Sequence, residues 1–497
     1  MEDSEFNEGV MLSHRRHVPE SRPLRRDSML NRAGNEEPFT ENIELHTLPS
    51  KQKQTQIEDE DEITTTQTGP YYPEEDPDKY PPKRSIALIL INNLMSEMSA
   101  TTALPISAAY TQYLGGTDAF SGLVIGIPTL VSLVLMYPML RFANPKSANG
   151  YTLYFRPMFT SCFAHIIGHL LYSLAYRAHW IYLILIGRMF NGIGFTMFLY
   201  HKKYLSDKEF VGRNKSTFLS TLNILAQTLG FMSGAFIGGT LAKASRNIHS
   251  PYWNEYTAGS WFMLIAWGVY MVFLKSFFIE ILPENNRSVT HREGTSGEQT
   301  VRLSLIQKIF VSFLFLTAFV CYFTIMGYQT SIPIYAGRLY NYNAFQTGNF
   351  LALSSLVIAP FILLSTFLSK WLEDRQIMLL GVLIGIIALV LHLILDAVHK
   401  IPVQPYFLLY SVMSFGFSVG SAPLVSLSSK QLHPKFQILV SIVVQVGVSL
   451  ADTVGAITGG AIYNITTIGF IAMNLGLAVL VFIELLCLWN SIKEKTT

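Results

Sequence analysis

The chain has 497 residues, of which half are hydrophobic and only 14% are charged, and its formal net charge is +2. Soluble proteins usually carry about a quarter charged residues, so this composition excludes an ordinary soluble domain and favours a membrane protein. The small net charge gives no reason to expect a nucleic-acid partner. The widely separated cysteines, Cys162, Cys321 and Cys487, form neither a disulfide framework nor a metal-binding motif.

The first segment, residues 1–84, differs in kind from the rest of the chain. It is rich in charged and polar residues and poor in large apolar ones. Such a segment buries too little surface to offset the entropy of ordering, so we expect a disordered cytosolic tail. Its string RRDS makes Ser28 a candidate phosphorylation site, although a plain solvated stretch is the simpler interpretation.

From residue 85 onward the chain alternates apolar runs with short polar loops. A helix needs about 20 apolar residues to cross a bilayer, and twelve runs meet this requirement. The predicted spans are Ser85–Tyr110, Ser121–Leu140, Pro157–Tyr176, Ile181–Tyr200, Phe218–Ala242, Ser260–Phe278, Ile306–Gly327, Asn349–Trp371, Ile377–Ala397, Tyr406–Ser429, Ile438–Asn464 and Ile468–Trp489.

The basic residues of the loops set the predicted orientation. Loops on the side of the N-terminal tail hold most of the Lys and Arg, for example Arg141, Lys202 and Lys435, whereas the opposite loops hold few, such as Arg177 and Lys400. Cytoplasmic loops carry this excess in membrane proteins. Both termini are therefore predicted to be cytosolic.

The spans divide into two sets of six. A polar linker over 279–304 separates a first bundle, 85–278, from a second bundle, 305–490, and a short tail follows over 491–497. Landmarks recur in order between the halves at a spacing of about 220 residues, including the pairs Gly238-Gly239 and Gly459-Gly460. We therefore predict an all-α membrane protein built from two pseudo-symmetric six-helix bundles.

Two helices carry motifs that resemble a known family. The fourth span reads GRMFNGIG and the fifth reads LGFMSGAFIGG, and both resemble signatures of the major facilitator superfamily of transporters, with Ala235 in place of the family's proline. Glycines spaced four apart let neighbouring helices approach closely, so we interpret them as packing residues. The packing glycines are Gly192, Gly194, Gly230, Gly234, Gly238, Gly239, Gly459 and Gly460.

The resemblance has further implications. The loop LSKWLEDRQ is similar to a family loop, which implies a gating role for Asp374 and Arg375 at the cytosolic helix ends. The stretches RNKSTFLSTLNILAQTLGFMSGAF and LHPKFQILVSIVVQVGVSLADTVGAITGG resemble the lysosomal ceroid-lipofuscinosis branch and its fungal relatives. This resemblance implies a vacuolar or lysosomal membrane, with the plasma membrane as the alternative.

Three charged residues lie deep in the predicted spans. At about 1.5 Å per helical residue, Glu97 and Arg188 lie about 18 Å, and Asp452 about 21 Å, above the cytosolic helix ends. Charges at this depth usually face a cavity or a partner and mark functional sites. Two interpretations remain open: Glu97 and Arg188 form a buried pair that fixes helix register, or Glu97 gains and loses a proton during transport.

Other polar residues near this depth complete the predicted substrate and proton pathway. Interhelical hydrogen bonds alone would also explain their presence. They are Asn92, Asn93, Asn191, Gln227 and Tyr322. No phosphate-binding loop motif occurs in the sequence, which argues against a nucleotide-driven pump, and we expect no enzyme activity, no metal and no cofactor.

The sequence thus favours a secondary active transporter. We expect alternating access between two bundles, a small organic solute or ion as substrate, and possible proton coupling through Glu97. One acid and one base in the predicted site favour zwitterions or organic cations over polyanions. An ion channel or facilitative leak on the same fold, and a receptor or scaffold that does not transport, remain as alternatives. The lipid bilayer is the expected surrounding, and a monomer the expected state.

Overall fold

The computed structural model describes seven stretches of the chain, and the regular structure within them is helical throughout. Residues 73–497 form one compact unit. Most of the predicted tail, including Ser28, and most of the predicted linker lie outside the described residues, and the first helix begins at Lys83, two residues before the predicted first span. The described stretches are 80–143, 153–206, 211–280, 303–368, 371–398, 401–432 and 434–492.

The first half contains six spans, of which the first and fourth are interrupted. Pro105 lacks a backbone donor, so the first span is broken where this residue stands. The fourth span is divided at Thr196. The elements are α1 (Lys83–Thr101), η1 (Leu104–Ile106), α2 (Ser107–Tyr113), α3 (Asp118–Ala143), α4 (Phe155–Ala178), α5 (Ile181–Phe195), α6 (Met197–Ser206), α7 (Arg213–Ser245) and α8 (Ala258–Phe277).

The second half repeats this pattern. Its fourth span, like that of the first half, is divided in two, here before Pro423. The elements are α9 (Leu305–Tyr340), α10 (Ala344–Leu368), α11 (Asp374–Val398), α12 (Val403–Ser421), α13 (Leu424–Gln431), α14 (Pro434–Gly460), α15 (Ile462–Ile465) and α16 (Thr467–Cys487).

The membrane-spanning character of the chain is confirmed. Within the described residues, 11 helices are long and apolar enough to cross a bilayer. The predicted first span falls outside this set, because α1 contains Asn92, Asn93 and Glu97 and is followed by the break at Pro105. The first span is therefore the most polar one, which directs attention to what its polar side chains contact.

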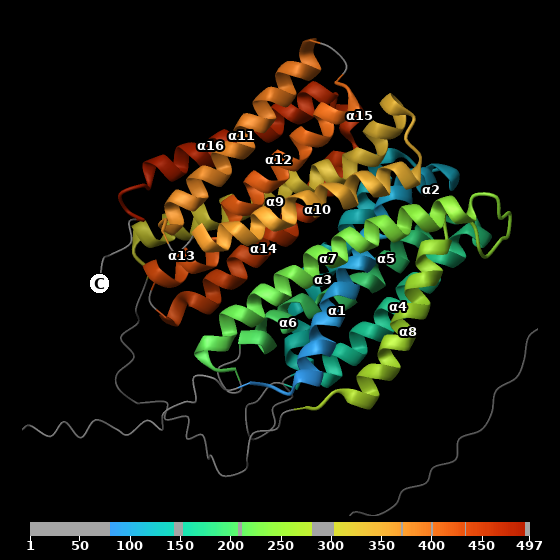
Figure 1. The fold of residues 1–497 in the computed structure, drawn as a ribbon, viewed down its shortest axis with the longest axis horizontal. Coiled ribbons are helices and arrows are strands. Elements are labelled where there is room, and N and C mark those ends of the chain that lie inside the picture. Colours follow the sequence, from blue (N-terminus) through green and yellow to red (C-terminus); the bar gives the residue numbers. More distant parts are fainter. Residues whose placement is uncertain are drawn as a thin grey trace, which may run out of the picture. The chain divides into compact units, whose positions relative to one another are not determined.

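Two pairs of helices join the halves. The helix α3 packs along α14 and α7 packs along α10, while α1 packs on α7 and α9 on α14 within their own halves (Figure 1). Each half has its own apolar core, represented by Trp267 in the first and Phe417 in the second. The second core continues into the first half through Leu104 and Ala235. The halves therefore share apolar packing where η1 and the middle of α7 meet the second bundle.

Candidate functional site

Arg188 lies on α5 and is almost fully buried, with 1% of its surface exposed. Its Nε donates to the Val124 carbonyl at 3.2 Å, its Nη1 to the Ser99 carbonyl at 3.0 Å and its Nη2 to the Ala100 carbonyl at 3.4 Å. Ser99 and Ala100 belong to the last turn of α1, whose carbonyls lack helical partners. A cation is the favoured cap for such an end, so Arg188 stabilises the break in the first span.

Glu97 is not the partner of Arg188. Among the residues that the structure describes, no ion pair joins the two side chains. The Arg188 guanidinium donates its hydrogen bonds to backbone carbonyls instead. The hypothesis of a Glu97–Arg188 pair is therefore wrong. Glu97 interacts electrostatically with Lys202 on α6, and it is partly exposed where Arg188 is not.

An electrostatic interaction connects Glu97, on α1 of the first bundle, with Asp452, on α14 of the second. Tyr322, on α9, interacts with both carboxylates and with the side chain of Ser421 at the end of α12. All four of these residues are partly exposed, and Lys202 is exposed. We call these five residues the central cluster.

The central cluster combines two acids, one base and two hydroxyl groups. Its residues come from five spans, two in the first half and three in the second, so a molecule bound there would touch both bundles. Carboxylates that remain partly exposed can accept hydrogen bonds from an ammonium group or take up a proton. The sequence predicted Glu97, Asp452 and Tyr322. It missed Lys202, which lies just beyond a predicted span end, and Ser421, which lies at the break between α12 and α13.

A second polar network lies beside Glu97 but is buried. Asn93 donates from Nδ2 to the Asn223 Oδ1 at 2.8 Å. The His201 ring lies with Nδ1 3.2 Å from Asn93 Oδ1 and Nε2 2.8 Å from Asn92 Oδ1. This network ties α1, α6 and α7 together, so Asn92 and Asn93 serve the packing of the first bundle. Sequence reasoning missed His201, which directly follows the predicted span and precedes Lys202 and Lys203.

Asn191 and Gln227 lie apart from the central cluster. Asn191 is fully buried in the first bundle, where it interacts with His165 and contacts Gly168. Gln227 is partly exposed on α7. Within the described part of the chain, no group of three or more His, Cys, Asp or Glu side chains is arranged to hold a metal ion.

The end of the bundles where α3 begins and α7 and α14 end is called the gate end here. Asp118, at the start of α3, accepts an ion pair and hydrogen bond from Arg338 of α9, and Gln112 also donates to it at 2.6 Å. Further along the same interface, the hydroxyl groups of Thr129 and Thr453 lie 3.1 Å apart. These contacts hold the two bundles together at the gate end.

Adjacent glycines at the gate end face in two directions. Gly238 lies against the Thr102 backbone of its own half, whereas Gly239 lies against the backbone of α10. In the second half, Gly459 lies against Gly327 of α9, and Gly460 against the Asp118 backbone of α3. A side chain at any of these four positions would collide with backbone atoms, so the expected packing role has a direct geometric basis.

The other predicted packing glycines act within the first bundle. Gly230 and Gly234 lie against α1, Gly192 lies against α3, and Gly194 lies against the ring of His165. Because Gly230 contacts the Leu94 carbonyl and the Cβ of Glu97, α7 fixes the position of the glutamate. The fifth-span signature therefore positions the central cluster without contributing a polar group.

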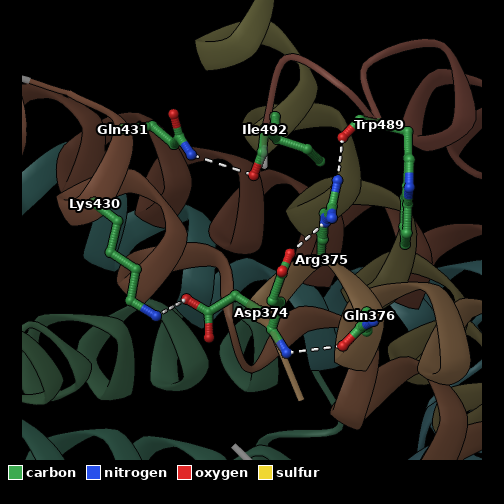
Figure 2. A network of polar contacts seen from close by, with 8 residues as sticks. Asp374, Arg375, Gln376, Lys430, Gln431, Trp489 and Ile492 are labelled. Atoms are coloured by element: carbon green, nitrogen blue, oxygen red, sulfur yellow. Dashed lines mark hydrogen bonds and ion pairs between the residues drawn. The ribbon is translucent and has the colours of Figure 1, made fainter. Parts of the chain in front are cut away.

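The opposite end, called the linker end, carries a polar network inside the second bundle. Asp374 accepts from Lys430 at 2.9 Å and from Ser426 at 2.7 Å. Arg375 donates to Glu373 at 2.6 Å and to the Trp489 carbonyl at 2.8 Å, and its guanidinium lies over the Trp489 ring (Figure 2). The Asp374–Arg375 pair thus links α11 to α13 and to the segment after α16.

Comparison with known proteins agrees with this architecture. The chain matches the family model described as Major Facilitator Superfamily over residues 87–456. It is 65% identical to an MFS-type transporter of Schizosaccharomyces pombe over 92% of this chain and 91% of the relative. It is 58% identical to a second MFS-type transporter of that organism, over 98% and 97% of the two chains.

A solved structure shows the same fold at low sequence identity. The bacterial homolog of the human lysosomal transporter Spinster, in an inward-facing and occupied conformation, superimposes with a TM-score of 0.63 at 13% identity, and the match covers 83% of this chain and 98% of that one. The helical architecture, the family match and the transporter relatives agree. The chain belongs to the major facilitator superfamily and is a multi-pass membrane transporter rather than an enzyme.

Proposed function

We propose that the protein is a secondary active transporter of a small cationic or zwitterionic organic solute, with Glu97 as a proton-carrying group. The observation that carries this proposal is the electrostatic interaction between Glu97 and Asp452, one from each bundle and both partly exposed. With Lys202 beside them, the three charges sum to one net negative charge when all three side chains are ionised. A solute with an ammonium group neutralises this excess, whereas a polyanion would be repelled.

The coupling step follows from the same charges. A proton bound at Glu97 removes the excess negative charge, and an arriving cationic solute does the same, so the two compete for the cluster. If the solute displaces the proton, movement of one across the membrane is linked to movement of the other. The solute and the proton compete through their charges at the central cluster. This coupling therefore does not require the solute to contact Arg188.

The contacts between the bundles support alternating access. The polar and glycine contacts that join α3 with α14, α7 with α10 and Asp118 with Arg338 lie toward the gate end. Opening the gate end requires these contacts to separate. We propose that the Asp374 and Arg375 network at the linker end holds α11, α13 and the segment after α16 as one unit while the bundles move.

Membrane location is part of the proposal. The resemblance of two long stretches to the lysosomal and fungal vacuolar branch favours a vacuolar or lysosomal membrane. A fluorescent protein fused after residue 497 and imaged with a vacuolar membrane marker checks this location. Signal confined to the plasma membrane would replace it with the alternative.

Proton movement in proteoliposomes tests the function. Purified full-length protein is reconstituted with a pH-sensitive dye inside, and lysine, choline and glycine betaine are added singly as probes, with succinate as the anionic comparison. We expect at least one of the first three probes to accelerate proton movement and succinate to have no effect. Glu97→Gln should abolish the solute-dependent proton movement.

Glu484→Gln is the matched control, because Glu484 also lies on a membrane helix, α16, but outside the central cluster. It should behave like the unsubstituted protein. The unsubstituted protein and Glu97→Gln could both transport radiolabelled solute while neither moves protons. That result would exclude a proton-carrying role for Glu97. Acceleration by succinate alone would overturn the substrate class.

A further inference from the structure

A cavity of about 440 Å³ lies at the gate end, separate from the central cluster. Its walls come from η1, α2, the end of α7 and the segment before α8 on one side, and from α9 and α10 on the other. None of the five residues of the central cluster lines it. Small-molecule sites commonly have volumes of about 300 to 1,000 Å³, so this cavity can hold a ligand of modest size.

The charged side chains of the cavity are mostly basic. Lys243 lies in the last turn of α7, Arg246 directly follows that helix and Arg338 lies on α9. Glu255 is the acidic residue among the lining side chains. Arg338 is already paired with Asp118. The hydroxyl group of Tyr256 engages Glu255, and burial together with this carboxylate raises the pKa of Tyr256.

The positive charges of Lys243 and Arg246 are therefore available to bind an anionic ligand. In the described part of the chain, no ion pair joins either of them to a carboxylate. The Lys243 Nζ lies 4.1 Å from the centre of the Phe345 ring, across the interface between the bundles. Lys243 is exposed, and an aromatic face holds an exposed cation only weakly, so this contact leaves the ammonium group able to bind an anion.

The rest of the lining is apolar and aromatic. Phe345, Tyr256 and Tyr342 supply ring surface, and Gln112 and Asn343 supply amide groups that can donate hydrogen bonds. A few directed polar groups in a largely apolar wall are the usual composition of a ligand site. The cations lie on one bundle and the Phe345 ring on the other, so one ligand would contact both.

We propose that this cavity binds a small organic anion, with its carboxylate or sulfonate group at Lys243 and Arg246 and its apolar body against Phe345 and Tyr256. Binding across the interface favours the state in which the gate end is closed, because that state alone brings α7 and α10 together around the ligand. The site is regulatory in character and opposite in charge preference to the central cluster.

Direct binding to the purified full-length protein tests the proposal. The probe is naphthalene-1-sulfonate, and the neutral comparison is 1-naphthalenemethanol, which has the same ring system. Isothermal titration calorimetry should show saturable binding of the sulfonate and binding of the alcohol that is at least tenfold weaker. The double variant Lys243→Gln with Arg246→Gln should weaken sulfonate binding at least tenfold.

Matched variants separate this site from a general surface effect. Arg177→Gln removes an exposed cation near the same end of the bundle that does not line the cavity, and it should leave binding unchanged. If the double variant loses its sharp gel-filtration peak, the single variant Lys243→Gln replaces it, with a loss of about threefold to tenfold expected from one charge-assisted contact.

Two results would overturn the proposal. The first is equal binding of sulfonate and alcohol, which would show ring partitioning without charge recognition. The second is unchanged sulfonate binding in folded Lys243 and Arg246 variants. Glu97→Gln should bind the sulfonate normally, so a failure of the transport proposal leaves this measurement intact.

Discussion

Arg188 and the pair Glu97 and Asp452 lie at similar depth in the chain's membrane helices, yet they have different surroundings. Arg188 is enclosed and donates to three carbonyls from two helices. Glu97 and Asp452 stay partly exposed, and their neighbours are other side chains that can exchange partners. The first arrangement fixes the backbone, and the second leaves room for a ligand.

This difference shows that depth alone does not assign a role to an intramembrane charge. A charge whose hydrogen bonds are all made to backbone contributes to the fold, since any solute would have to displace those bonds first. A charge that faces other titratable groups can respond to a proton or a solute. Three substitutions test this distinction, in order of expected effect.

The largest effect is expected for Arg188→Gln. The shorter amide cannot reach all three carbonyls, and acceptors at the end of α1 are left buried without donors. Breaking a buried charged contact of this kind costs about 3 to 5 kcal/mol, so the thermal midpoint of the purified protein should fall by several degrees. Glu97→Gln is the comparison and should shift the midpoint little.

An equal thermal midpoint for Arg188→Gln and the unsubstituted protein would contradict the structural role of Arg188 that distinguishes it from Glu97 and Asp452. In that case the carbonyls at the break of the first span would have found water or other donors. Arg188→Lys refines the measurement, since a single ammonium keeps the charge and part of the hydrogen bonding. The thermal midpoint of Arg188→Lys should lie between those of Arg188→Gln and the unsubstituted protein.

An intermediate effect is expected for Lys202→Gln. Removing the cation beside Glu97 leaves the central cluster more negative, so a cationic solute should bind up to about tenfold more tightly, or about 1.4 kcal/mol. The measurement is the KM for the transported probe in proteoliposomes. Lys275→Gln, an exposed lysine of α8, is the control.

Weaker binding of the cationic probe in Lys202→Gln would give Lys202 another role. The lysine would then contact an acidic part of the solute directly. That result would narrow the substrate class from cations to zwitterions, and it would keep the central cluster as the binding site.

The smallest effect is expected for Tyr322→Phe. The ring and its packing remain, and only the hydroxyl group that hydrogen-bonds with Ser421 and interacts electrostatically with Asp452 is lost. One hydrogen bond contributes about 0.5 to 1.5 kcal/mol, so the KM should rise about twofold to tenfold without a change in thermal midpoint. Tyr182→Phe, with an exposed ring on α5, should change neither quantity.

Much of the fold could be predicted from the sequence, because a bilayer demands long apolar runs and the two halves repeat the same landmarks. The glycine signatures of the fifth and eleventh spans marked close helix contacts correctly, since few other reasons place glycines four apart in an apolar helix. Glu97 and Asp452 could be recognised as deep charges for the same reason. These inferences depend on local composition alone.

The partners of these charges could not be predicted. Arg188 was matched with Glu97 by depth, but depth does not specify the rotation of each helix or the free carbonyls that a proline creates nearby. Lys202 was counted as a loop charge, because the fourth span continues past its break into α6. The contact of Asp118 with Arg338 joins positions far apart in the sequence and left no local signal.

The paired glycines at the gate end have a consequence for the way the molecule can change shape. In each pair, one member joins a helix to its own half while its neighbour touches the opposite half, and the two pairs are related by the internal repeat. In the proposed alternating-access movement these backbone contacts separate when the gate end opens, and no side chain interlocks across them. A larger residue at Gly239 or Gly460 would hold the two halves apart there and so change the turnover rate, while the chemistry of solute recognition stays the same.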